Sequence, residues 1–223
     1  MSIIFIIVAG IILMFTAIGV IFRDEVRAVF DRDPAASNYA EILLSYAGLH
    51  AIILYKIAHF LYGLKIPLIP RIISQAARFF TGIEIHPGAI IGKGFFIDHG
   101  MGVVIGQTTV IKDNVTIFQG VTLGGTGKEK GKRHPNIEAN VVIGTGAKVL
   151  GNITIGENSY IGANAVVIKD VPENSTIVGV PGRVTKQAGK KIDSLFDHVH
   201  VLDPIKQSME ALEKRITDLE KRK

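Results

Sequence analysis

The sequence predicts an α+β fold in which helices precede a parallel β-helix built from six-residue repeats. Two observations support this prediction. Aliphatic residues recur at every sixth position from about residue 82 onward, and the residues before that point read as apolar helices. The chain has 223 residues, of which 24 are glycine, and glycine suits the corners of short turning strands. Hydrophobic residues make up 48% of the chain, enough to build a core.

Composition and motif searches exclude several classes of function. The chain contains no cysteine, which rules out disulfides, thiolate zinc sites, iron–sulfur clusters and a cysteine nucleophile. The formal net charge is only +5 and the basic residues are scattered, so we expect no nucleic-acid partner. The sequence has neither the G-x-x-x-x-G-K-[ST] pattern of a nucleotide P-loop nor the G-x-S-x-G pattern of a nucleophile elbow.

We expect residues 1–22 to form a transmembrane helix. The stretch 2–22 carries no charged side chain, and as a helix it would rise about 30 Å, one hydrocarbon thickness. No basic start or small-residue cleavage site is present, which favours an uncleaved single-pass anchor over a secretory signal. Arg23, Arg27 and Arg32 follow it, so the positive-inside rule places the rest of the chain in the cytoplasm. The alternative is a helix buried in an oligomer.

Residues 23–80 are expected to form a helical N-terminal domain. The stretch from Glu41 to Leu64 is rich in Leu, Ile, Ala and Tyr. Pro67 and Pro70 interrupt the pattern, which then resumes up to Phe80.

Residues 81–187 are expected to form the β-helix. Steps of six residues from Ile85 reach Val121, and a second series runs from Ile143 to Val167. Period six with small residues at the corners describes short strands that turn every six residues. Three sides then make a triangular coil of eighteen residues, and stacked coils bury the aliphatic rows in a central column.

A loop interrupts the repeat at residues 124–136. Leu123 and Ile143 occupy the same type of position but lie 20 residues apart, which is not a multiple of six. The inserted stretch is glycine-rich and charged and has no aliphatic row, so we expect it to protrude from the coil. Long loops on rigid scaffolds commonly carry function.

Residues 188–223 are expected to form a connector and a C-terminal helix. Apolar residues there follow a heptad spacing: Ile205, Met209, Leu212, Ile216 and Leu219. Fewer than three heptads is short for an independent coiled coil, so the helix would act as a clip on an existing oligomer.

Two dipeptides in the repeat region carry chemistry. In Asp98-His99 an imidazole that titrates near neutral pH is placed for proton transfer, although such a pair is often structural. Arg133-His134 lies in the protruding loop, where an arginine can form a fork onto a carboxylate. The alternative for the loop is a solvated basic segment. His86, His99 and His134 lack the close spacing of a zinc site, so no metal is expected.

Six motifs follow one another in an order that resembles the serine O-acetyltransferase family. They are Arg32-Asp33-Pro34-Ala35, Ile85-His86-Pro87, Ile97-Asp98-His99, the run from Val121 to Lys128, Arg133-His134-Pro135 and Gly179-Val180-Pro181-Gly182-Arg183. The resemblance covers about residues 23–187. It implies a left-handed β-helix after a helical domain, in a homotrimer or a dimer of trimers. It also implies the formation of O-acetyl-L-serine, the first step of cysteine biosynthesis from serine.

The resemblance further implies direct attack of the L-serine hydroxyl on acetyl-CoA, without an acyl-enzyme. His99 matches the family's general base, and Glu84 matches its orienting carboxylate, where many members have aspartate. Four positions match those that bind serine, with Asp33 and Asp98 on the ammonium group and Arg133 and His134 on the carboxylate. Four more match the CoA groove, namely Gly125, Thr126, Thr145 and Ala163. Gln107 departs from a glutamate found in many members and receives no role.

The expected partners follow from the same resemblance. L-Cysteine is expected to inhibit by competing with serine, and the site is expected to lie between neighbouring subunits. A complex with O-acetylserine sulfhydrylase is doubtful, because the chain ends in the basic segment Leu219–Lys223 instead of an isoleucine. Two alternatives stay open: a same-fold acetyltransferase for another hydroxyl acceptor, and a non-enzymatic membrane-tethered scaffold. Asp33 and Arg133 favour an amino-acid acceptor, since a sugar has neither charged end.

Overall fold

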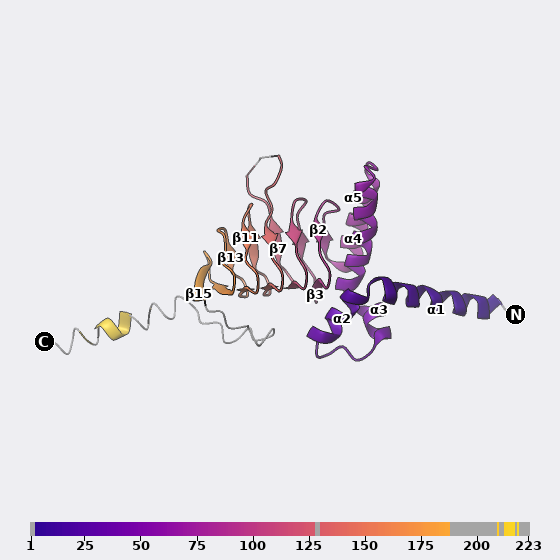
Figure 1. Ribbon diagram of the computed structural model, residues 1–223, viewed down its shortest axis with the longest axis horizontal. Helices are drawn as coiled ribbons and strands as arrows, with labels where there is room; N and C mark the ends of the chain where they lie inside the picture. Colours follow the sequence, from indigo (N-terminus) through magenta and orange to yellow (C-terminus); the bar gives the residue numbers. More distant parts are fainter. Residues whose placement is uncertain (1–2, 128–129, 188–208, 210–211, 217, 219–223) are drawn as a thin grey trace.

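The computed structural model shows a column of stacked strands with helices at one end (Figure 1). It describes residues 3–127, 130–187, 209, 212–216 and 218. The N-terminal half of the chain forms five helices: α1 (Ile3–Ile21), α2 (Arg23–Arg32), α3 (Tyr39–Ser45), α4 (Ala47–Gly63) and α5 (Ile69–Thr81). Helices α4 and α5 stand beside the first strands, whereas α1 extends away from the column (Figure 1).

Local sequence explains where these helices begin and end. The Asn38 side chain accepts a hydrogen bond from the Glu41 backbone N–H at 2.9 Å and so caps α3. Pro70 lies in the first turn of α5, where its missing N–H costs nothing. Gly82 ends α5 in the left-handed conformation with φ 73°, which glycine adopts without strain.

Parallel strands form a three-sided β-helix. Sheet A contains β1 (Glu84–Ile85), β4 (Val104–Ile105), β7 (Thr122–Gly124), β10 (Lys148–Leu150) and β13 (Val166–Val167). Sheet B contains β2 (Ile90–Ile91), β5 (Val110–Ile111), β8 (Asn136–Ile137) and β11 (Thr154–Ile155). Sheet C contains β3 (Phe96–Asp98), β6 (Thr116–Phe118), β9 (Val142–Ile143), β12 (Tyr160–Ile161), β14 (Ser175–Val178) and β15 (Arg183–Gln187), the last antiparallel to β14.

The repeat has one irregularity that the period-six series did not reveal. Glu84 pairs with Val104, 20 residues later, whereas Val104 pairs with Thr122 after 18 residues. The buried column therefore runs from Ile97 to Ile105, not to Val103 as the series from Ile85 assumed. That series was wrong beyond Ile97 because the corner between β3 and β4 is two residues longer than the next one. Val103 is buried as well, so the sequence pattern hid the shift.

The helical region is fixed to the first coil by close packing and buried polar contacts. Gly48 of α4 lies so near β3 that an added Cβ would be 2.3 Å from the Ile97 carbonyl oxygen. The Tyr55 hydroxyl donates to the Ala89 carbonyl at 2.6 Å. Lys56 Nζ donates to the buried Glu25 carboxylate at 2.7 Å and joins α4 to α2. These contacts place residues of α2–α4 beside β3.

The expected transmembrane helix is not confirmed. In the part of the chain that the structure describes, no single helix is both long and apolar enough to cross a membrane. Helices α3 and α4 pass that test only when taken together, with a bend of 65° between them. The described side chains of α1 include exposed Leu13, Val20 and Ile21.

The C-terminal expectations fall largely outside the described residues. Met209, Leu212 and Ile216 of the heptad series are helical and exposed. Ile205 and Leu219, and with them the terminal segment Leu219–Lys223, lie outside the described residues.

Candidate active site

His99 stands at the lengthened corner between sheets C and A. Its backbone φ is 56°, and its side chain is exposed in the single chain. Left-handed φ values are uncommon for residues other than glycine, although His is among the residues that tolerate them. Gly100 and Gly102 follow with φ 85° and 78°, so the corner turns without further steric cost. The two extra residues thus present the imidazole on the outside of the column.

Asp98 and Asp33 lie on the same side of the molecule although 65 residues of sequence separate them. Asp98 ends β3, and Asp33 ends α2 in an extended conformation. The Tyr46 hydroxyl donates to Asp33 Oδ2 at 2.6 Å, and the negative charge of Asp98 also acts on Tyr46. The structure therefore brings the two predicted ammonium ligands to one place, next to His99.

Glu84 is held by α5. Its Oε2 lies 3.3 Å from Arg78 Nη1, and its Oε1 lies 3.8 Å from Arg71 Nη2. Gln75 Nε2 donates to the same Oε1 at 3.5 Å, a long contact. Glu84 sits near the His99 corner, because Gly102 N–H of that corner donates to Gly82. The carboxylate that would orient His99 is thus shared with two arginines.

Arg133 and His134 are fixed at the corner between sheets A and B. Thr108 Oγ1 accepts hydrogen bonds from the backbone N–H groups of Arg133 at 3.1 Å and His134 at 3.2 Å. The Thr108 backbone N–H donates to His134 Nδ1 at 3.3 Å, so the neutral ring carries its proton on Nε2. A Cβ added to Gly106 would lie 2.0 Å from the His134 ring, so only glycine leaves room for the imidazole.

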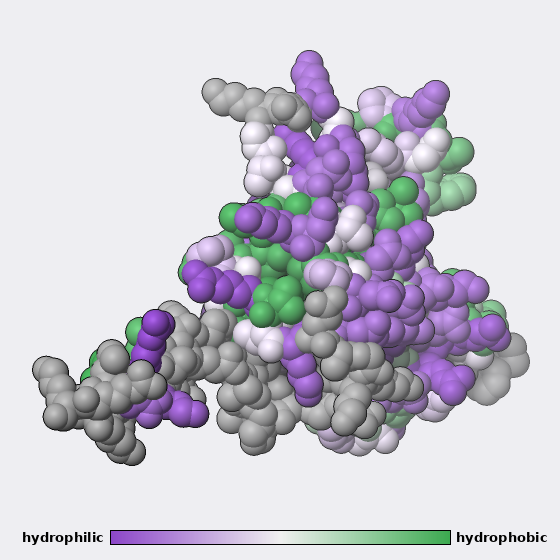
Figure 2. Space-filling model, turned by 60° about the vertical axis from the view of Figure 1, so that its left-hand side comes forward, coloured by the Kyte–Doolittle hydropathy of each residue, from purple (hydrophilic) through white to green (hydrophobic). Residues whose placement is uncertain are grey.

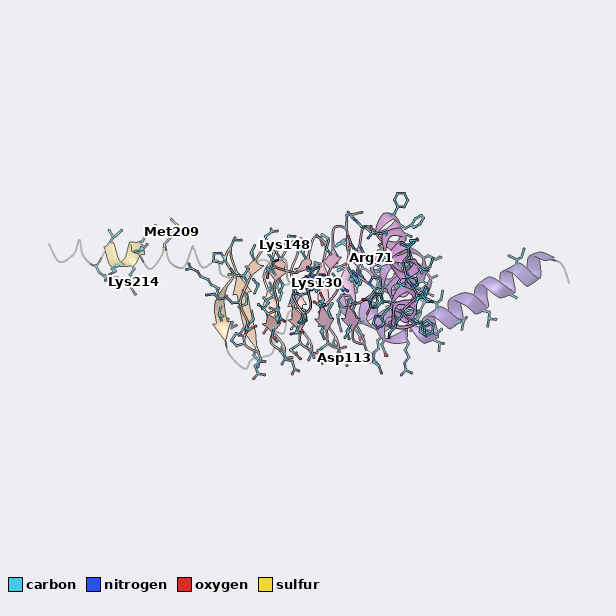
Figure 3. All side chains as sticks on the ribbon, turned by 90° about the horizontal axis from the view of Figure 1, so that it is seen from above. Arg71, Asp113, Lys130, Lys148, Met209 and Lys214 are labelled. Atoms are coloured by element: carbon cyan, nitrogen blue, oxygen red, sulfur yellow. The ribbon has the colours of Figure 1, made fainter. Side chains whose placement is uncertain are left out.

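Burial keeps two histidines near this corner neutral. Desolvation lowers the pKa of His86 to about 4, and the charges of Arg71 and His134 act in the same direction. Desolvation also lowers the pKa of His134, with help from Arg133 and Lys132. Arg71 lies at the junction of the helices and the first coil (Figure 3). At neutral pH the corner offers an arginine cation and a neutral imidazole N–H donor, both suited to a carboxylate.

The four predicted CoA residues divide between two corners. Register places Thr145 opposite Ala163 at the corner between sheets C and A, the same edge as His99. Gly125 and Thr126 follow β7, at the corner between sheets A and B. There an added Cβ on Gly125 would lie 3.0 Å from Arg133 Cγ.

The predicted residues therefore form two groups on opposite edges of sheet A. One group contains Asp33, Asp98, His99, Thr145 and Ala163, and Glu84 lies near it. The other contains Gly125, Thr126, Arg133 and His134. One side of the coil spans roughly 15 Å at ~3.3 Å per residue. A single amino acid cannot reach across that distance with its two charged ends.

Three residues of the site carry no signal in a single sequence. Tyr46 and Thr108 act through contacts with residues 13 and 25 or 26 positions away. Gln119 follows Phe118, which pairs with Asp98, so Gln119 lies one coil from His99 on the same edge. Its Oε1 is buried without a hydrogen-bond partner among the described residues. The 20-residue spacing from His99 would locate it only after the longer corner is known.

Hollows and metal-binding groups do not mark the site. A hollow of about 850 Å³ lies among α1, α2 and α3 and is lined by none of the predicted residues. Among the described residues no three His, Asp or Glu side chains are grouped to hold a metal ion. On the face shown in Figure 2, hydrophilic residues predominate and hydrophobic residues form smaller patches.

Family models match two parts of the chain. The model of the serine acetyltransferase N-terminal region matches residues 3–53, which include the apolar α1. The model of the bacterial transferase hexapeptide, six repeats long, matches residues 134–169. This second match supports the left-handed form of the β-helix.

Whole-chain relatives agree with the family models. A serine acetyltransferase of Bacillus subtilis is 59% identical over 197 residues, covering 88% of this chain and 91% of the relative. One of Staphylococcus aureus is 59% identical over 194 residues, covering 87% and 91%.

Solved structures agree as well. A serine acetyltransferase in complex with cysteine aligns with a TM-score of 0.76 and 43% identity over 79% of this chain and 69% of that one. The Brucella abortus protein in complex with coenzyme A gives 0.73 and 45% over 75% and 67%. The Neisseria gonorrhoeae protein in complex with serine gives 0.73 and 41% over 77% and 70%.

Proposed function

The chain belongs to the serine acetyltransferase family and transfers the acetyl group of acetyl-CoA to L-serine, and we propose that His99 is the general base of this reaction. The proposal rests on one observation above the others. His99 stands exposed at a lengthened corner, on the side of the column where Asp33 and Asp98 come together. The products are O-acetyl-L-serine and CoA, and L-cysteine, which has the same two charged ends, is a feedback inhibitor.

The proposed mechanism assigns each charged residue to one part of serine. Asp33 and Asp98 bind the ammonium group, while Arg133 and His134 bind the carboxylate. With both ends held, the serine hydroxyl is directed at the thioester carbon. His99 removes the hydroxyl proton as the oxygen attacks and returns a proton to the departing CoA thiolate. Glu84 orients His99 when it exchanges part of its contact with Arg78 and Arg71 for the imidazole.

We further propose that the site is completed by a second copy of the chain. The ammonium group of residues and the carboxylate group of residues lie on opposite edges of sheet A. Serine needs both within one small volume. Packing the His99 edge of one column beside the Arg133 edge of the next supplies both, and a closed ring of three columns repeats the arrangement. Gly125 and Thr126 would then face Thr145 and Ala163 across the CoA groove.

The substrate assignment is tested by thiol release. We expect purified enzyme to release CoA from acetyl-CoA rapidly with L-serine. Release should be slow without an acceptor, with L-homoserine, or with a sugar. Faster release with another hydroxyl acceptor than with L-serine would favour the alternative acetyltransferase. No release with any acceptor would favour a scaffold without enzymatic activity.

We also propose that residues 1–22 associate with a membrane, with the catalytic region on the cytoplasmic side. The support is physical: exposed Leu13, Val20 and Ile21 on α1 are followed by Arg23 and Arg27. Deletion of residues 1–22 should then leave an active enzyme that no longer sediments with membranes. If the full-length protein instead stays in solution without detergent, α1 contacts another copy of the chain and the membrane proposal is wrong.

A further inference from the structure

Tyr46 occupies the bend between α3 and α4 and holds Asp33 in place. Its half-buried hydroxyl donates to Asp33 Oδ2 at 2.6 Å. The other oxygen, Oδ1, accepts the Ala35 backbone N–H at 2.8 Å. Both carboxylate oxygens therefore have a donor, and the Asp33 side chain is held in one orientation although it lies in a connecting segment.

The position of Tyr46 next to Asp98 follows from packing. Helices α3 and α4 meet at 65°, and Tyr46 is the residue between them. Two residues later, Gly48 touches the Ile97 carbonyl so closely that no larger residue fits. This contact sets the start of α4 against β3 just before Asp98. Tyr46 thus lies between the two carboxylates because glycine permits the close approach.

Negative charge gathers around this hydroxyl. Burial raises the pKa of Tyr46 well above its usual value, as do the hydrogen bond to Asp33 and the charges of Asp33, Glu41 and Asp98. The hydroxyl therefore stays a donor at neutral pH. Arg32, adjacent to Asp33 in sequence, directs its guanidinium elsewhere, to Thr116 Oγ1 at 2.9 Å and the Val115 carbonyl at 3.4 Å. Such an arrangement is suited to a cation supplied by a ligand.

We propose that Tyr46 is a positioning residue that holds the Asp33 carboxylate for the ammonium group of the amino-acid substrate. The lone pairs of its hydroxyl oxygen provide a further acceptor for that group. This inference rests on the proposed function. It adds a residue that acts on recognition of serine and cysteine through Asp33, and not on the proton transfer at His99.

The test is Tyr46→Phe, which keeps the ring and removes only the hydroxyl. We expect KM for L-serine to rise roughly tenfold or more, the loss typical of a hydrogen bond to a charged group. Within about twofold, kcat and KM for acetyl-CoA should stay unchanged. The matched control is Tyr39→Phe, because Tyr39 is exposed and stacks edge-on against Phe30. It should leave all three constants unchanged.

A double-mutant cycle separates positioning from a structural role. In an Asp33→Asn background, Tyr46→Phe should have little further effect on KM for serine, since its hydroxyl acts through Asp33. An equal effect in both backgrounds would overturn the proposal, as would an unchanged KM in Tyr46→Phe alone. Equal losses of kcat and of thermal stability, without change in KM, would show that Tyr46 is structural. Failure of the proposed function itself would be visible separately, as the absence of serine-dependent thiol release in the wild-type enzyme.

Discussion

Replacing His99 with alanine is expected to lower kcat by about 10²–10⁴-fold, the usual contribution of general acid–base catalysis. The imidazole is the group placed to remove the serine proton, and water replaces it poorly. Binding of CoA should persist, because Thr145 and Ala163 belong to other coils of the column. Steady-state thiol release gives kcat, and calorimetric titration with CoA gives the affinity.

The matched variant for this experiment is His99→Asn. Asparagine tolerates left-handed backbone angles such as φ 56°, whereas alanine adds strain there. A loss of activity shared by both variants therefore reports on the missing base and not on a distorted corner. If either variant keeps nearly full kcat, His99 has no part in proton transfer.

Replacing Arg133 with alanine should weaken serine and cysteine together. A charge-assisted hydrogen bond is worth about 1.5–3 kcal/mol, so KM for serine and Kd for cysteine should each rise roughly 10–150-fold. Initial rates over a range of serine concentrations and calorimetric titration with L-cysteine provide the two values. Because the backbone of Arg133 is held by Thr108 Oγ1, the loop should keep its place in the variant.

Lys130→Ala is the control for Arg133→Ala. Lys130 is an exposed cation of the same loop, and Figure 3 shows it away from the helical end of the column, near Lys148. Its removal should leave both ligands bound as in the wild type. Equal weakening in the two variants would mean that the loop attracts anions by its net charge alone. Unchanged cysteine binding in Arg133→Ala would remove Arg133 from the carboxylate site.

Periodicity predicted the β-helix because each coil buries a regular row of aliphatic residues. The family models and the pairing of the strands confirm that prediction. The same periodicity misplaced the row beyond Ile97, because both Val103 and Ile105 are aliphatic and buried. Strand register, a property of contacts between coils, was needed to reveal the two additional residues at the His99 corner.

The apolar N-terminus shows a second limit of sequence reasoning. Length and composition predict a membrane span for residues 1–22, yet a helix can be apolar for a membrane or for a contact with another protein chain. The match of the family's N-terminal model to residues 3–53 places this segment within the region shared with other members. The deletion experiment decides between the two environments.

The sequence by itself determined the architecture, the family and the chemical types of the site residues, because short motifs and periods are local properties of the chain. Only the tertiary structure decided how those residues are grouped. It joined Asp33 to Asp98 through Tyr46, fixed Arg133 and His134 on Thr108, and gave Glu84 to the arginines of α5. It also separated the two halves of the site along sheet A. The physical reason is that side chains distant in sequence meet only through coil register and helix packing, which depend on all the elements together.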